Sequence, residues 1–371
     1  MPTALGGLNV LDFSRVLAGP LVTMVLGDLG AAVTKIESPA GDDTRQWGPP
    51  YDAAGDATYF QSVNRNKRSV VLDLADPADL AGARSMAREA DVVVENFRPG
   101  VTERFGLDYG SLREANPGLV YCSITGFGAG KGAALPGYDL LVQALGGLMS
   151  ITGPPDGEPQ KVGVALVDVL AGLFATVGIL AALEYRRESG EGQLVEVDLL
   201  SSVLAALVNQ ASAYTVAGVV PERMGNAHPS ITPYEPLRCA DAELVVAVGN
   251  DRQFAALCDV LGSPELSDDP RFATNAARIA NRAAMRAALE ERLAARPAGV
   301  WADSLTAARV PAGVVNDIAA AFDLARTLGL SPVVGIERED GTTIELVRNP
   351  IRLSATPPTY RSAPPRFPRR G

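Results

Sequence analysis

A single charged residue stands inside the most apolar stretch of the chain. Asp168 lies within Val162–Leu183, where every other residue is aliphatic, Gly, Phe or Thr. A carboxylate in such surroundings is costly to bury unless hydrogen bonds or a helix end compensate it. The residues alone leave two interpretations open. Asp168 either caps a buried helix, or it is a partly desolvated nucleophile or base at the mouth of a cleft.

The other residue types narrow the chemistry. His228 is the only histidine, so no set of histidines exists for a metal site, and we predict none. Cys122, Cys239 and Cys258 show neither disulfide nor zinc spacing, which is typical of a reducing cytosol. The turn Asp12–Pro20 lacks the G-x-G-x-x-G pattern of dinucleotide-binding folds. Carboxylates, tyrosines, serines and backbone amides must therefore carry any reaction.

Two cationic segments are candidates for binding an anionic ligand. Asn64–Ser69 contains three cations within four positions. Such a run is either a solvated surface or a patch for phosphates. Asn96–Gly100 combines polar, aromatic and cationic residues after an expected strand, and Arg104 follows it. The second segment is well placed for a ligand that carries a nucleotide.

The pattern along the chain predicts an α/β fold. Short apolar strands alternate with helices, which favours a parallel sheet covered on both faces, with ligands at the carboxyl ends of its strands. The expected strands are Leu8–Phe13, Ala32–Glu37, Ser69–Leu74, Asp91–Glu95 and Leu119–Thr125. A break near Gly218–Asn226 marks a second unit, and the Pro- and Arg-rich tail from Ser354 is expected to be poorly packed or to lie on a partner.

Composition sets the broad class. With 371 residues, the chain is long enough for two domains. The formal net charge of −10 argues against nucleic acid or an anionic membrane as the main partner. Val162–Leu183 is long enough to span a bilayer, but its carboxylate, its glycines and the absence of a second such stretch favour a buried core helix. The first residues show no basic, apolar leader pattern, so a cytoplasmic location is expected.

A series of motifs in a fixed order resembles the class III CoA-transferase family, which includes formyl-CoA transferases and α-methylacyl-CoA racemases (CaiB/BaiF type). The resemblance runs from Leu5 to about Val315. Its motifs are DFSRVLAGP, LGDLGAAVTKIE, NRNKRSVVLDL, ADVVVENFRPG, GYDLLVQALGG, the segment around Asp168, GILAALEYRRESGEGQLVEVDLL and RMGNAHPSITPYEP.

The resemblance implies a specific architecture. A large Rossmann-like domain would occupy residues 1–200, with a linker at 201–225 and a small α+β domain at 226–310. Residues 311–371 would form a second linker and a segment that returns to the large domain. Two chains would interlock as a threaded homodimer. Coenzyme A or an acyl-CoA would bind as substrate, with no permanent cofactor.

The resemblance also implies roles for individual residues. Asp168 would be the catalytic nucleophile, which forms a covalent aspartyl intermediate while CoA moves from an acyl-CoA to a free carboxylic acid. The implied contacts with CoA are Val16, Leu17, Ala18, Leu72, Ala75, Asn96, Phe97, Arg98, Arg104, Tyr138 and Asp139.

Two departures from the family pattern bear on the reaction. Some transferases carry Gln where Leu17 stands, and the glycine-rich loop of the oxalate-handling transferase is replaced by His228-Pro229-Ser230, so oxalate and formate are not expected as substrates. The racemases use a His where this chain has Tyr138, and a phenol is a poor base at neutral pH. A racemase that exchanges an α-proton and a CoA-binding protein without turnover remain the alternatives.

Overall fold

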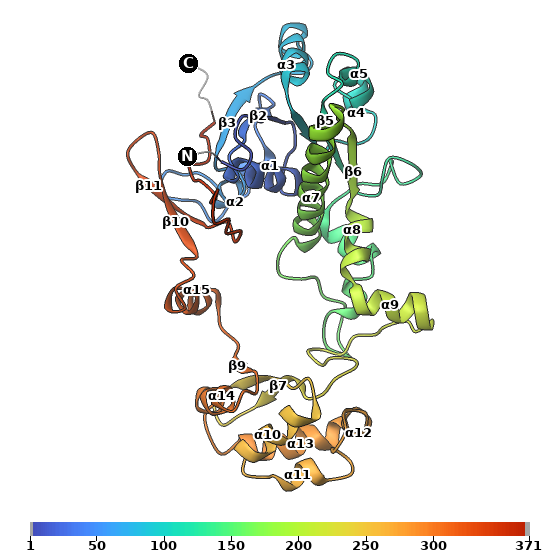
Figure 1. Ribbon diagram of the computed structural model, residues 1–371, viewed down its shortest axis with the longest axis vertical. Coiled ribbons are helices and arrows are strands. Elements are labelled where there is room, and N and C mark those ends of the chain that lie inside the picture. Colours follow the sequence, from blue (N-terminus) through green and yellow to red (C-terminus); the bar gives the residue numbers. More distant parts are fainter. Residues whose placement is uncertain (1–2, 368–371) are drawn as a thin grey trace. The chain divides into compact units, whose positions relative to one another are not determined.

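The structure is a computed structural model that describes residues 3–367. The chain forms two compact units (Figure 1). The first unit contains the residues up to Leu148, then Lys161–Val220 and the segment from Ser331 onward. The second unit contains Met149–Gln160 and Pro221–Leu330.

A six-stranded parallel sheet forms the centre of the first unit, which confirms the predicted α/β class. The strand order is β3-β2-β1-β4-β5-β6, and all neighbouring pairs are parallel. The strands are β1 (Asn9–Asp12), β2 (Ala32–Glu37), β3 (Lys67–Val71), β4 (Val92–Glu95), β5 (Val120–Thr125) and β6 (Leu194–Asp198). The order reverses around β1, so the loops after β1 and β4 face a shared crevice at the carboxyl edge.

Helices cover both faces of this sheet because its strands alternate side chains between two apolar layers. Val10, Val92 and Cys122 face one layer, whereas Leu11 and Val93 face the other. The first layer packs against α1 (Ala18–Asp28), α6 (Asp139–Leu145), α7 (Leu166–Ser189) and α8 (Leu199–Ala206); the second packs against α3 (Pro77–Glu89) and α5 (Tyr109–Arg113). Shorter elements of this unit are η1 (Asp43–Gln46), α2 (Thr58–Ser62), α4 (Val101–Arg104) and α9 (Val208–Ala217).

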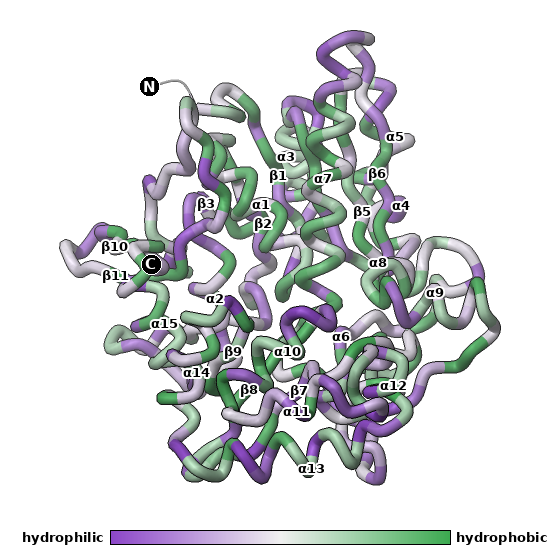
Figure 2. The backbone as a smooth tube through the Cα atoms, turned by 60° about the horizontal axis from the view of Figure 1, so that its bottom comes forward, coloured by the Kyte–Doolittle hydropathy of each residue, from purple (hydrophilic) through white to green (hydrophobic). Residues whose placement is uncertain are grey.

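Helix α7 is the long apolar helix that the sequence predicts, although it begins at Leu166 rather than Val162. Val162 precedes the helix, and its backbone N–H donates to Oε1 of Gln143. Buried side chains recur about every fourth residue along α7, from Val167 to Ala182, and form the stripe that packs on the sheet. Figure 2 shows the hydrophobic colouring along this helix. It is long and apolar enough to cross a membrane, but it packs as a partly buried core helix.

The cationic run Asn64–Ser69 is neither a solvated surface nor a phosphate patch over most of its length. Arg65 is 3% exposed and forms a bidentate pair with Asp28, at 2.6 and 2.8 Å. Lys67 is 4% exposed and lies 3.1 Å from Asp12. Only Arg68 of the three cations is exposed. Both predicted roles are therefore wrong for Arg65 and Lys67, because buried carboxylates from α1 and β1 neutralise them.

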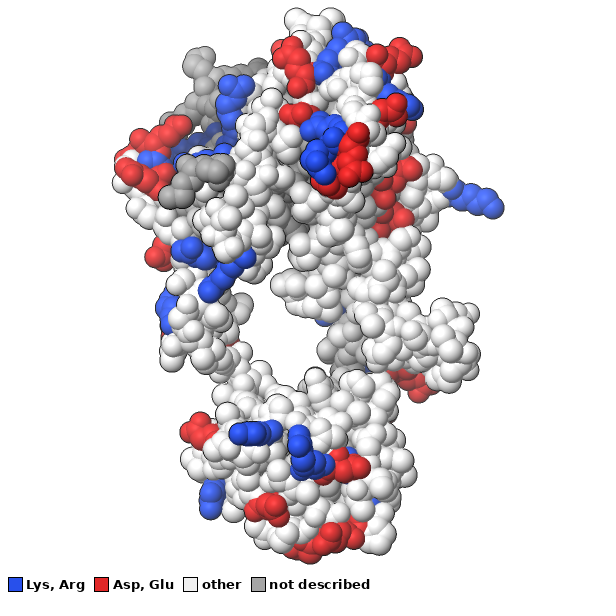
Figure 3. All heavy atoms as spheres, viewed as in Figure 1, with Lys and Arg blue, Asp and Glu red and all other residues white. Residues whose placement is uncertain are grey.

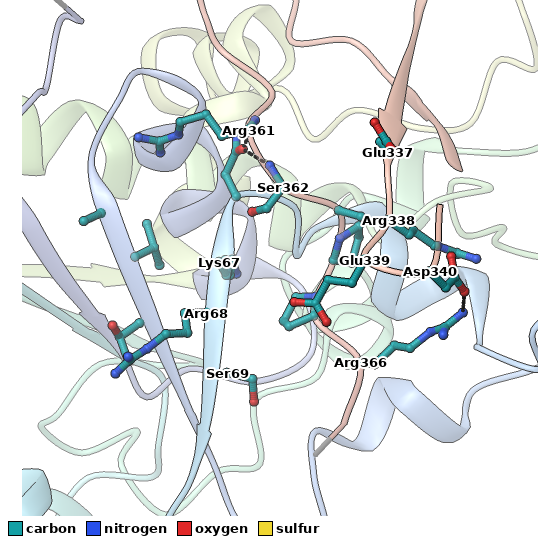
Figure 4. Close-up of a pocket in the computed structure, with 17 residues that line it drawn as sticks. Lys67, Arg68, Ser69, Glu337, Arg338, Glu339, Asp340, Arg361, Ser362 and Arg366 are labelled. Atoms are coloured by element: carbon teal, nitrogen blue, oxygen red, sulfur yellow. Dashed lines mark hydrogen bonds and ion pairs between the residues drawn. The ribbon is translucent and has the colours of Figure 1, made fainter. Parts of the chain in front are cut away.

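Residues 359–362 of the C-terminal segment are hydrogen-bonded to their own unit, which corrects the expectation of poor packing for this part of the tail. The backbone N–H of Asn66 donates to the carbonyl of Ser362 at 3.0 Å. The Arg361 guanidinium donates to three carbonyls around the end of α1, those of Gly27, Gly30 and Ala31. Figure 4 shows Arg361 and Ser362 beside the strand that carries Lys67–Ser69. An antiparallel hairpin of β10 (Val333–Glu337) and β11 (Thr343–Val347) precedes this tail.

The second unit has its own core. Its antiparallel sheet contains β7 (Tyr234–Arg238), β8 (Glu243–Ala247) and β9 (Ala312–Val314). Its helices are η2 (Met149–Ile151), α10 (Asp251–Val260), α11 (Glu265–Asp268), α12 (Asn275–Ala280), α13 (Arg282–Leu293), α14 (Ala298–Ala307) and α15 (Ile318–Thr327). Arg278 is fully buried in this unit and donates to the carbonyls of Thr232 and Phe272 and to Asp251.

Candidate active site

The turn between β1 and α1 forms one wall of the candidate site. Two hydrogen bonds of 2.8 Å tie the backbone N–H and carbonyl of Arg15 to the amide of Asn96, just after β4. Val16 has a φ of 69°, in the left-handed region. A β-branched residue there is strained by about 1–3 kcal/mol, so surrounding contacts must impose the conformation. The loops after β1 and β4 are thus joined at the carboxyl edge of the sheet.

Helix α7 brings Asp168 to this turn because a glycine lets it approach α1 closely. A Cβ at Gly172 would lie 2.9 Å from the carbonyl oxygen of Ala18. Any side chain at this position would push the two helices apart. Asp168 lies one turn before Gly172, and it therefore reaches the same end of α1 as the turn.

Asp168 does not cap its own helix. Ala165 occupies the N-cap position, and Asp168 is the third residue of α7. The capping oxygen comes from Asp139, the first residue of α6, whose Oδ1 accepts from the backbone N–H of Val167 at 2.8 Å and of Asp168 at 3.3 Å. The capping interpretation of Asp168 is therefore wrong, and its carboxylate is not used to hold the helix end.

The Asp168 carboxyl group is easier to protonate than an ordinary aspartic acid. Burial of the group, followed by the nearby negative charge of Asp139, raises the pKa of Asp168 from 3.8 to about 7. The N-terminus of α7 favours the ionised form, but it does not outweigh these two effects. A carboxylate with weakened solvation is a better nucleophile than one in bulk water.

Asp168 opens onto a cavity of about 200 Å³ at the carboxyl edge of the sheet. Most of the residues predicted from the sequence line this cavity together with it: Val16, Leu17, Ala18, Asn96, Phe97, Arg98 and Tyr138. The predicted contacts Leu72, Ala75, Arg104 and Asp139 are not part of the lining. Leu72 packs partly buried against the second apolar layer, and the Arg104 guanidinium lies 5.7 Å from the ring of Phe105.

Asp139 has most of its hydrogen-bonding capacity engaged inside the protein. Besides the two N–H groups of α7, its Oδ2 accepts from Nε2 of Gln143 at 2.6 Å. The geometry supports a role in fixing α7 and in setting the charge state of Asp168.

Reasoning from the sequence missed one residue that lines the cavity, Arg15, and one that the charge of Asp168 affects, Tyr59. The pKa of Tyr59 on α2 is raised by burial and then by the negative charges of Asp168 and Asp139, which places its phenol in their field. Its ring meets Trp47 edge-on at 5.3 Å. Arg15 lines the cavity. Tyr59 shows no pattern in the sequence that could have revealed it, whereas Arg15 stands within the DFSRVLAGP motif.

The arrangement suits chemistry at an acyl group. A partly buried carboxylate meets a rigid turn and two cations, Arg15 and Arg98, in one cavity. Within residues 3–367, no group of three or more His, Cys, Asp or Glu side chains is placed to hold a metal ion. The cavity presents the partly buried carboxylate of Asp168 to a bound ligand, and the exposed carboxylate of Asp43 also lines it.

Comparison with known proteins identifies relatives over nearly the whole chain. The model of the family described as CoA-transferase family III matches residues 5–369. The succinate–glutarate CoA-transferase of Agrobacterium fabrum is 45% identical over 98% of this chain and 92% of its own length. The acetyl-CoA:oxalate CoA-transferase of Acetobacter aceti is 43% identical over 94% of this chain and 88% of its own. The crystal structure of a CaiB/BaiF family protein from Brucella suis is 44% identical, with a TM-score of 0.88 over 99% of this chain and 97% of that one.

Replacement of Asp139 with Asn is expected to lower the pKa of Asp168 from about 7 toward its ordinary value. The substitution removes the neighbouring charge, while the new amide oxygen can still accept the Val167 N–H. A carbon-13 NMR titration of aspartate carboxyls measures the shift, and Asp168→Asn assigns the resonance. An unchanged or higher pKa in Asp139→Asn would contradict the assigned role.

Stability gives a second readout of the same effect. The folded protein holds an extra proton on Asp168 between its ordinary pKa of 3.8 and its raised value of about 7. This contribution to the free energy of unfolding is present below pH 3.8 and is lost as the pH rises through 7. In Asp139→Asn the loss should be complete at a lower pH, as measured by urea unfolding across the pH range.

Proposed function

Because the chain belongs to CoA-transferase family III, we propose that it moves CoA from an acyl-CoA to a free carboxylic acid through a covalent intermediate on Asp168. The observation that carries this proposal is the Asp168 carboxyl, freed from capping by Asp139 and opening onto a cavity. The turn Val16–Ala18 lines the same cavity, where a thioester would be held against the carboxylate.

The proposed steps balance without proton transfer. A carboxylate oxygen of Asp168 attacks the thioester carbonyl carbon, and the C–S bond breaks. CoA leaves as a thiolate, and the acyl group stays on Asp168 as a mixed anhydride. The thiolate attacks the aspartyl carbonyl carbon, and the donor acid leaves as carboxylate. The acceptor carboxylate then attacks this aspartyl thioester and again releases thiolate. Attack of the thiolate on the new acyl carbonyl gives the product thioester and restores the Asp168 carboxylate.

The cycle begins with the ionised carboxylate of Asp168 and restores it in the last step. The raised pKa of about 7 therefore means that a fraction of the free enzyme is protonated at neutral pH. Because an acyl-CoA has no basic group that could deprotonate Asp168, it reacts only with the enzyme molecules in which Asp168 is ionised. We accordingly expect the rate of acylation to fall as the pH drops below 7.

Racemisation is less well supported than transfer. Proton exchange at an α-carbon requires an acid/base group on each face of the thioester. Tyr138 stands at the position where the resemblance places a racemase His, and its side chain is exposed at the cavity. Among residues 3–367, the two carboxylates that line the cavity are Asp168, which is partly buried, and Asp43, which is exposed. A single nucleophile is sufficient for transfer.

The acyl groups are proposed to be dicarboxylic. The Agrobacterium relative is named for succinate and glutarate, and the Acetobacter relative for acetyl-CoA and oxalate. Of these four acids, succinate, glutarate and oxalate have two carboxylates. Two cations, Arg15 and Arg98, line the cavity with Asp168, although the protein as a whole carries a net charge of −10. One of them can receive the distal carboxylate. The Acetobacter relative also places oxalate among the acids to be assayed, although the sequence did not favour it.

The nucleotide end of CoA is proposed to run outside this cavity, past Leu72, Ala75 and Arg104. These residues follow β3 or end α4 in the same unit as the cavity. Their place beyond the lining residues suits the length of CoA, whose thioester is far from its adenine. The guanidinium of Arg104 would then bind a phosphate.

A homodimer is the proposed form of the enzyme, in the interlocked arrangement that the family resemblance implies. Large apolar side chains are exposed on α7 at Leu173, Phe174 and Val177 and on α9 at Val208 and Val216. Helix α9 contains no charged residue, and the surface over it is mostly uncharged on the face drawn in Figure 3. Apolar surfaces of this kind mark interfaces.

With free cysteines at all three positions, we also propose a cytoplasmic location for the enzyme.

Asp168→Asn is expected to lower kcat by at least ~10³-fold, because the amide cannot form the anhydride. Binding of CoA, measured by calorimetry, should persist. Wild-type enzyme treated with succinyl-CoA and then hydroxylamine should carry a hydroxamate at Asp168 in peptide mass spectra. Glu184→Gln, an exposed carboxylate on the same helix, is the matched control and should retain full activity. Turnover in Asp168→Asn would exclude the mechanism.

Arg15→Gln is expected to raise KM for a dicarboxylate acceptor such as glutarate about tenfold, which corresponds to loss of one charge-assisted contact. The KM for a monocarboxylate such as butyrate should stay constant, since it has no distal charge. Arg68→Gln removes an exposed cation that does not line this cavity and serves as the control. Equal effects on both acceptors would assign Arg15 to CoA rather than to the acyl group.

Light scattering of the purified enzyme tests the oligomer. The expected mass is twice 38.7 kDa at micromolar concentration. Phe174→Glu, on the exposed face of α7, should lower the mass or abolish soluble expression, because it buries a charge in the interface. A fully active monomer would refute the dimer and leave the transfer chemistry in place.

A further inference from the structure

Four buried charges lie beneath the turn that forms the wall of the candidate site. They are Asp12 at the end of β1, Lys35 in β2, Asp42 before η1 and Lys67 in β3, and none is more than 4% exposed. Lys67 Nζ lies 3.1 Å from Oδ2 of Asp12, and Lys35 Nζ lies 2.9 Å from Oδ2 of Asp42. We call these four residues the buried quartet.

Such a group is not explained by stability alone. Removing charges from water costs about as much as their mutual attraction returns, and apolar residues of similar size often serve the fold as well. Although burial raises it, the charges of Lys67 and Lys35 and the hydroxyls of Ser14 and Thr23 lower the pKa of Asp12 to about 2. Burial lowers the pKa of Lys67 to about 8. Both groups are therefore ionised at neutral pH.

The quartet is hydrogen-bonded along the length of the turn. Asp12 accepts from the backbone N–H and the hydroxyl of Ser14. Lys35 donates to the carbonyl of Ser14 at 2.7 Å, and Lys67 donates to the carbonyl of Pro20 at 2.9 Å. These contacts fix both ends of the segment that runs from β1 into α1.

The middle of the turn is held by Asp42. Its Oδ1 accepts from the backbone N–H of Val16 in a long hydrogen bond of 3.4 Å, and it also accepts from the N–H and hydroxyl of Thr44. Val16 is the residue with the left-handed backbone, at φ 69°. A β-branched residue does not adopt this conformation unless its surroundings impose it. The strained residue thus coincides with the contact from Asp42.

Packing adds to this restraint. A Cβ at Gly19 would lie 2.2 Å from the Cβ of Ser14, so the start of α1 rests directly on the residue that Asp12 and Lys35 hold. The turn is thus held by hydrogen bonds from the buried quartet and by close packing against the start of α1. The segment Val16–Ala18 of this turn lines the cavity with Asp168.

We propose that the buried quartet is a set of positioning residues for catalysis, which keeps Val16 in its left-handed conformation and so fixes the Val16–Ala18 wall against the Asp168 carboxylate. The inference rests on the proposed function, because its consequence is a correctly placed thioester. A displacement of about 1 Å in such a wall can cost a large factor in rate.

Asp42→Asn combined with Val16→Gly tests this coupling. Asp42→Asn alone should lower kcat at least tenfold, with a smaller change in KM for acyl-CoA, because the amide weakens the hold on a strained backbone. Glycine adopts the left-handed region without strain. In the Val16→Gly background, Asp42→Asn should therefore lower kcat less than threefold. A purely structural Asp42 would show the same loss in both backgrounds, and that result would overturn the proposal.

A matched control separates positioning from folding. Asp28, at the far end of α1, is another fully buried carboxylate, paired with Arg65. Asp28→Asn should lower the midpoint of thermal unfolding at least as much as Asp42→Asn while kcat stays within twofold of the wild type. Equal losses of kcat in the two variants would show a general effect of stability and refute positioning.

The measurements also separate this inference from the proposed function. Wild-type transfer and the hydroxamate at Asp168 test the function, and they do not involve the quartet. If they fail, the function is wrong. If they succeed while the Asp42→Asn and Val16→Gly effects on kcat are independent, only the positioning role is wrong.

Discussion

The close crossing of α1 and α7 is the constraint on which the site depends. Because Gly172 has no side chain, α7 approaches the carbonyl of Ala18. Asp168, one turn earlier, then meets the turn between β1 and α1. The long apolar stripe of α7 secures this crossing through the core. One missing Cβ thus connects the hydrophobic packing of the unit to the position of the Asp168 carboxyl group.

Carboxylates then hold and adjust the site that this packing positions. Asp139 supplies the cap of α7 and at the same time raises the pKa of its neighbour Asp168. The same carboxylate therefore stabilises a helix end and raises the pKa of a neighbouring carboxyl group. On the opposite wall, the buried quartet holds the turn at Val16. The two walls are thus held by carboxylates that a ligand need not touch.

The comparison of sequence and structure shows where local reasoning succeeds. Strands β1, β2, β4 and β5 followed from short apolar runs because each buries both faces. The residues of the DFSRVLAGP and ENFRPG segments were expected at the site, and the parallel sheet does gather them at one edge. The cationic run around Arg65 and Lys67 was misjudged, because their partners Asp28 and Asp12 are distant in sequence. No local pattern reports such a pair.

The sequence by itself determined the α/β class and the apolar helix with its single carboxylate, since these depend on periodicity and residue type. Its ordered motifs also resembled the family to which the chain belongs. Only the tertiary structure decided that Asp139 caps the helix, that Tyr59 lies in the field of Asp168 and that Val16 is strained. These features arise where segments far apart in the chain meet. Asp168 could be singled out from its neighbours in sequence, but a contact from another helix is what leaves its carboxylate unused in capping α7.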